Sequence, residues 1–69
     1  MNKQIETYRK AGYTHIVSYK EMLEWAGIFV EKSFPTTADV MQKHIDTLKK
    51  HQYNENGDEM IIAIKAIAL

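Results

Sequence analysis

The spacing of apolar positions changes along the chain and predicts a series of short elements. Ile5 and Tyr8 lie one helical turn apart among polar residues, which predicts a helix over residues 3–11 that stops at Gly12. Residues 13–17 follow as a short run with β-strand character. A helix followed by a strand is therefore expected at the start of the chain.

The segment that begins at Ser18 carries the local signals of a second helix. Ser18 and Glu21 have the spacing of a capping box, in which the side chain of each residue accepts a hydrogen bond from the backbone amide of the other. Gly27 stands where a glycine commonly ends a helix. A glycine inside a helix costs only about 1 kcal/mol relative to alanine, so a helix that continues through Lys32 remains open. An apolar face follows the cap, formed by Met22, Leu23 and Ala26.

A third helix is predicted to begin after Pro35, which disfavours helical backbone in the residue before it. Thr36–Asp39 has the pattern of a helix start, with Asp39 near the positive end of the helix dipole. The helix is expected to run to about His51. Its buried stripe is formed by Met41, Ile45 and Leu48.

Asn56-Gly57 marks a tight turn, since both residues tolerate a positive φ. Residues 59–67 then combine isoleucines, which favour a strand, with residues that suit a helix. We predict a strand and keep a helix as the alternative. Such a strand has apolar side chains on both faces and is typical of a homodimer or a partner-bound chain. A monomer with an apolar tail is the other interpretation.

This order of elements resembles that of winged helix-turn-helix domains. His15–Val17 matches the first strand, Ser18–Gly27 the second helix and Thr36–Lys50 the recognition helix, with the wing between Tyr53 and Met60. The resemblance implies an α+β fold with three helices and a short β-hairpin near the C-terminus. Residues 1–69 would form one domain of this kind.

The resemblance also implies binding of double-stranded DNA in transcriptional regulation or a related DNA transaction. The third helix would enter the major groove, where Gln pairs with adenine and Lys with guanine. Other lysines would contact phosphates. The same residues also suit an ordinary solvated helix face. The predicted nucleic-acid-binding residues are Thr36, Thr37, Gln42, Lys43, Lys49, Lys50 and Lys20.

The alternative function is a non-enzymatic protein-interaction module, such as a small phage- or plasmid-type inhibitor or adaptor. Aromatic side chains are enriched at the anchors of protein interfaces, although Trp25 also suits a place in the core. The arrangement of charge distinguishes the two functions. Lysines that form one continuous face favour DNA, whereas interruption by Asp39, Asp46 and Glu31 favours protein. The alternative site consists of Trp25, Phe29, Phe34, Ile62 and Ile64.

Composition narrows these classes further. Nine basic residues balance nine acidic ones, which lowers the expectation of a dedicated nucleic-acid binder. The chain has no cysteine, no signal-peptide pattern and no long apolar run, so we expect a cytoplasmic protein without a membrane partner. No catalytic motif is present and His15, His44 and His51 lack the spacing of metal ligands. We expect no enzyme, cofactor or metal.

Overall fold

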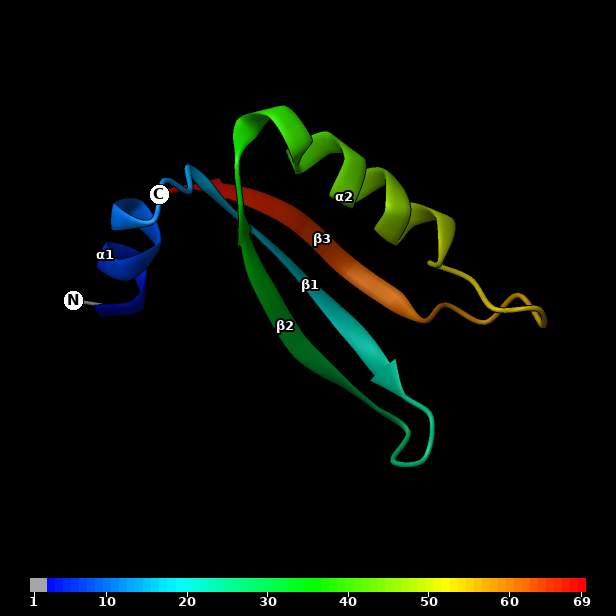
Figure 1. The fold of residues 1–69 in the computed structure, drawn as a ribbon. Coiled ribbons are helices and arrows are strands. Elements are labelled where there is room, and N and C mark those ends of the chain that lie inside the picture. The colour runs from blue at the N-terminus through cyan, green and yellow to red at the C-terminus, as the bar shows by residue number, and fades with distance from the viewer. Residues whose placement is uncertain (1–2) are drawn as a thin grey trace.

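The computed structural model describes residues 3–69 and contains a three-stranded antiparallel sheet and two helices (Figure 1). The central strand β1 is bordered by β2 on one side and β3 on the other. The chain runs in the order α1, β1, β2, α2, β3. The bounds are Lys3–Lys10 for α1, His15–Leu23 for β1, Ile28–Thr36 for β2, Ala38–Lys50 for α2 and Ile61–Ala68 for β3.

Strands β1 and β2 form a long hairpin that pairs without interruption from His15↔Thr36 to Leu23↔Ile28. Its turn is closed at the Leu23 carbonyl, which accepts hydrogen bonds from the amides of Ala26 at 3.1 Å and Gly27 at 2.8 Å. Gly27 has φ +67°, a left-handed conformation that glycine adopts without steric cost. This glycine therefore ends a turn, where a helix end was expected.

The predicted helix over residues 18–27 is wrong, and so is the predicted fold of three helices with a C-terminal hairpin. Ser18–Leu23 belongs to β1 and residues 28–36 form β2. The capping box is a local signal worth about 1 kcal/mol, whereas the strand is held by pairing along both of its edges. Pro35, which lacks an amide donor, is accommodated because β2 is an edge strand.

The predicted wing is also wrong, although its turn exists. Only one isolated bridge, Tyr53↔Glu59, flanks the turn, so the two sides do not form a hairpin of two strands. The segment after the turn becomes β3, as predicted for residues 59–67, and the helical alternative is excluded. β3 pairs with β1 in place of the preceding segment.

The first and last predicted helices are confirmed with small changes at their ends. α1 covers residues 3–10 of the expected 3–11, and Gly12 follows it with φ +95°. α2 covers residues 38–50 of the expected 36–51. Neither described helix has the length and hydropathy needed to span a bilayer.

The sheet has one face covered by a helix and one face that no helix covers extensively. β2 and β3 are both antiparallel to β1, so they run parallel to each other, and α2 makes the crossover between them. α2 packs on β1 and β3, whereas α1 has no extensive contact with the sheet. The ring of Phe34 lies 4.8 Å from the ring of His44 on α2, which identifies the face of Phe34 as the covered face.

Side chains of paired residues point to the same side of a sheet, and successive residues alternate. Val17 is paired with Phe34 and is fully buried on the covered face, where Ile61, paired with Glu21, is 5% exposed. The opposite side is called the open face below. It carries Ile16, Ser18, Lys20 and Met22 from β1, Phe29, Glu31, Ser33 and Pro35 from β2, and Ile62, Lys65 and Ile67 from β3.

A β-bulge in β3 changes which isoleucines share a face. The register shifts between the Ser18↔Lys65 and Lys20↔Ile62 pairs, and Ala63 within the shift has φ +57°. Because of the extra residue, Ile62 lies on the open face while Ile64 lies on the covered face. A regular strand would have placed both on one side.

Candidate interaction site

The hairpin formed by β1 and β2 extends beyond β3, whose pairing with β1 ends at Glu21↔Ile61. Residues 22–29 are called the hairpin end below (Figure 1). Trp25 at its turn is 86% exposed and Ile28 beside the turn is 54% exposed. Large apolar side chains gathered at a solvent-exposed tip are typical of protein interaction sites. The hairpin end is therefore the first candidate.

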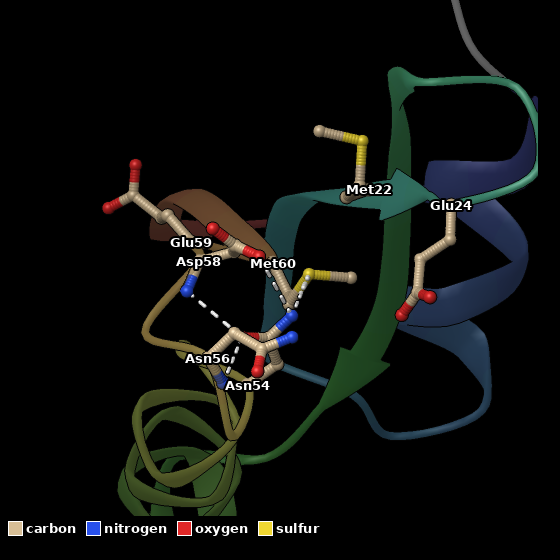
Figure 2. A pocket seen from close by; sticks show the side chains of 7 residues that line it. All are labelled: Met22, Glu24, Asn54, Asn56, Asp58, Glu59 and Met60. Atoms are coloured by element: carbon tan, nitrogen blue, oxygen red, sulfur yellow. Dashed lines mark hydrogen bonds between the residues drawn. The ribbon is translucent and has the colours of Figure 1, made fainter.

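A hollow of about 410 Å³ lies between the hairpin end and the loop that joins α2 to β3. Figure 2 shows Met22 and Glu24 on the side of β1, the asparagines on the side of the loop, and Met60 between them. The hollow is therefore made by two segments that are far apart in the sequence. Its lining consists of Met22, Glu24, Asn54, Asn56, Asp58, Glu59 and Met60.

The loop side of the hollow is held in shape by Asn54. The Asn54 side-chain oxygen accepts hydrogen bonds from the amides of Asn56 and Asp58, both at 2.9 Å. The Gly57 amide donates to the Asn54 carbonyl at 3.0 Å, and Gly57 has φ +82°. On the other side, the Met22 amide donates to the Met60 carbonyl at 2.8 Å and fixes the loop to β1. The hollow is thus bounded by hydrogen-bonded backbone.

The lining of the hollow combines acid groups with thioethers. Glu24, Asp58 and Glu59 supply carboxylates, Met22 and Met60 supply apolar sulfur-containing chains, and no lining residue is basic. A Lys or Arg side chain has the matching chemistry, because an apolar stem carries its charged head. Among residues 3–69, no group of His, Asp or Glu is arranged to hold a metal ion.

The residues predicted to bind DNA lie in three separate environments. Thr36 is 2% exposed at the end of β2, and Lys20 lies on the open face, away from α2. Gln42 donates to the Asp46 carboxylate at 3.0 Å. The structure therefore brings together only the residues of α2 itself, namely Gln42, Lys43, Lys49 and Lys50, with Thr37 at its start.

Acidic residues interrupt the lysines along α2. Asp39 precedes Lys43 by one turn, and Asp46 follows it by nearly one turn on the same exposed stripe. On β2, Lys32 forms an ion pair with Glu21 at 2.5 Å, and this hydrogen bond raises the pKa of Lys32. Acidic groups thus lie among the lysines of α2 and β2.

Thr37 and Asp39 interact at the start of α2. Thr37 is the N-cap residue, but its hydroxyl donates to the Asp39 carboxylate and makes no cap to the backbone. This hydrogen bond, with backbone amides of the first turn, lowers the pKa of Asp39. A carboxylate at this position repels a phosphate group, so the start of α2 is poorly suited to a DNA backbone.

The residues predicted for protein binding are divided by the sheet. Trp25 is exposed at the hairpin end, and Phe29 and Ile62 lie on the open face. Phe34 contacts α2 on the covered face, the face that also carries Ile64. The five residues predicted for protein binding therefore lie on two different surfaces and in the core beneath α2.

The sequence did not indicate the hollow. Met22 and Glu24 were assigned to a helix, while Asn54 and Met60 were assigned to a wing, so nothing placed them together. The acidic run of the loop was visible in the sequence and was the one signal that pointed to this region. Comparison of the chain with protein families, with curated proteins and with solved structures finds no match.

Proposed function

We propose that the chain is a non-enzymatic protein-binding module that uses its hairpin end to bind a basic segment of a partner protein. The observation that carries this proposal is Trp25, held 86% exposed at the tip of a hydrogen-bonded turn. Tryptophan is among the residues most enriched at interface anchors, because it offers a large apolar area with few rotatable bonds.

The chemistry of the neighbouring hollow supports the kind of partner. Trp25 and Ile28 would contact apolar side chains, while the carboxylates of Glu24, Asp58 and Glu59 attract a Lys or Arg beside them. Complementary charge of this kind raises the association rate and selects the partner. Salt is then expected to weaken the binding moderately.

DNA binding, the function expected from the sequence resemblance, is not favoured by these observations. The interrupted lysine stripe on α2 and the acidic hollow beside the hairpin end both oppose a phosphate backbone. A titration of the protein against random duplex DNA at low and moderate salt distinguishes DNA binding from protein binding. Binding that falls steeply with salt would support phosphate contacts and overturn the protein-binding proposal.

The direct test is a selection of random displayed peptides against the immobilised protein, with the Trp25→Ala variant as the counter-target. We expect selected peptides to contain Lys or Arg next to apolar residues and to bind the variant at least tenfold more weakly. Because Trp25 is so exposed, its loss is expected to change stability by less than about 0.5 kcal/mol. Peptides that bind both proteins equally would contradict the assignment.

A matched control is Tyr13→Ala, which removes another exposed aromatic ring outside the hairpin end. Its peptide binding should equal that of the unchanged protein. A combined Glu24→Gln and Asp58→Asn variant should lose the preference for basic peptides while it keeps the apolar contribution. If charge removal leaves the selected sequences unchanged, the hollow has no part in recognition.

A further inference from the structure

The isolated chain exposes more surface than a compact protein of its mass. Its accessible surface is 5111 Å² for 8.0 kDa, whereas a compact monomer of that mass exposes about 4,450 Å². Among the described residues only two hydrophobic side chains, Val17 and Ile61, are buried. The surplus of roughly 650 Å² approaches the ~800 Å² that each partner contributes to a standard protein interface.

The open face of the sheet carries part of this apolar surface, arranged in rows across the strands. One end row contains Pro35, Ile16 and Ile67, which are paired across β2, β1 and β3. The other end row contains Phe29 and Met22. Ile67 is 48% exposed, and none of these five side chains is buried. Two apolar rows therefore flank the middle of the face.

The middle of the open face is mostly polar and carries both signs of charge, with Ile62 as its apolar member. Lys20 is paired with Glu31, and Lys65 is paired with Ser18 beside them. A hollow of about 180 Å³ is lined by these four residues with Tyr19 and Ala63, at the position of the bulge. Both lysines lie within one row of the glutamate, so the middle of the face offers donors and an acceptor to a second copy of itself.

We propose that two copies of the chain form a symmetric dimer by packing their open faces together. A two-fold axis that runs across the strands lays the row of Ile16 on the partner row of Phe29, and the reverse contact follows by symmetry. The same operation lays the two middle rows on each other, with Glu31 opposite Ser33 and Lys20 opposite Ser18. The stacked sheets lie about 10 Å apart and each is covered outside by its own α2.

The second copy fits this face better than an unrelated partner because the pattern is self-complementary. An interface about a two-fold axis must fit itself after a half-turn, so that apolar rows meet apolar rows. The two apolar end rows on either side of a mixed-charge middle meet this condition. The dimer leaves Trp25 at both tips accessible and goes beyond the proposed function, which uses the hairpin end.

The first test measures the molar mass of the protein by sedimentation equilibrium between about 5 and 500 µM. We expect twice the chain mass at the upper concentrations. Ser33→Arg places a long charged side chain in the middle of the open face, where the monomer tolerates it because Ser33 is exposed. This variant should be monomeric, with the dissociation constant raised at least a hundredfold. A monomeric unchanged protein throughout the range would overturn the proposal.

Thr47→Arg is the matched control, since Thr47 is an exposed hydroxyl residue on α2, away from the open face. It should dimerise like the unchanged protein, and monomers here would show that added charge alone prevents association. Trp25→Ala should also remain dimeric. Failure of dimerisation is thereby distinguished from failure of peptide binding, because Trp25 lies outside the open face and Ser33 lies outside the hairpin end.

Exchanging the charges between two variants controls for loss of dimerisation that is caused by unfolding. Glu31→Lys leaves only positive charge in the middle of the open face, and the double variant Lys20→Glu with Lys65→Glu leaves only negative charge. Each should be monomeric when alone, and an equimolar mixture should form heterodimers. Recovery of association in the mixture supports the open face as the interface, whereas two variants that stay dimeric alone would contradict it.

Discussion

The covered and open faces of the sheet are built from the same strands but serve different purposes. On the covered face, under α2, Val17 is fully buried and Ile61 is 5% exposed. Ile67 belongs to the same strand as Ile61 but lies on the open face, and it is 48% exposed. The free energy of folding of the single chain therefore comes largely from the covered face. The open face and the hairpin end keep apolar surface for other molecules.

The largest expected effect separates two isoleucines of β3. Ile61→Ala should lower the free energy of unfolding by about 2–4 kcal/mol, because it leaves a cavity beneath α2. Ile67→Ala should cost less than about 1 kcal/mol in the monomer, since half of the side chain already contacts water. Urea unfolding followed by circular dichroism at low micromolar concentration gives both values. Equal losses would abolish the distinction between the faces.

The next effect concerns the hairpin end. Gly27→Ala should destabilise the protein by about 1 kcal/mol, because alanine is strained at φ +67° although space surrounds it. The same urea titration measures the loss. Ala26→Gly is the neighbouring control, with no positive φ to relieve. An unaffected Gly27→Ala protein would show that the turn has more freedom than its hydrogen bonds indicate.

The bulge that assigns isoleucines to the two faces can be stabilised. Ala63→Gly should raise the free energy of unfolding by about 0.5–1 kcal/mol, because glycine accepts φ +57° without steric cost. Ala66→Gly, in the regular part of β3, should lower it by a similar amount. If both substitutions destabilise equally, Ala63 does not occupy a left-handed conformation and the placement of Ile64 must change.

The smallest effect lies at the start of α2, beyond both faces. Thr37→Val removes the hydroxyl that donates to Asp39 and should raise the pKa of Asp39 toward its ordinary value. Because the folded pKa is lowered, this contribution to stability is present above the ordinary Asp range and is lost as the pH falls through the folded value. An NMR titration of the Asp39 carboxyl measures it.

Thr47→Val is the control for that titration, since the Thr47 hydroxyl donates to the Lys43 carbonyl at 2.9 Å and does not interact with Asp39. It should leave the Asp39 titration curve unchanged. An Asp39 curve that is the same in all three proteins would mean that the backbone amides alone lower its pKa.

The helices and the last strand could be predicted because their signals are long and consistent. In α2 the stripe of Met41, Ile45 and Leu48 repeats over several turns, and each of these residues is at least half-buried in the way expected. The isoleucines of β3 gave the correct type of element. In such segments local preference and tertiary packing agree.

The hairpin could not be predicted, since its local signals favour another structure. Ser18, Glu21 and Gly27 fit the start and end of a helix, and a few such signals outweigh the weak alternation of the strand. Pairing of β1 with β2, up to twenty-one positions away, and with β3, up to fifty-three positions away, decided the outcome. The candidate site could not be predicted for the same reason. The bulge in β3 and the proximity of Glu24 to Asp58 depend on the register of segments that are distant in the sequence.

The position of Trp25 has a consequence for how the protein can be observed. It is the single tryptophan of the chain, and its indole is surrounded by water in the folded state much as in the unfolded one. Its fluorescence emission should therefore stay nearly constant through unfolding and shift to shorter wavelength only when another molecule covers the tip. Trp25 fluorescence should therefore report binding at the hairpin end and respond little to unfolding of the chain.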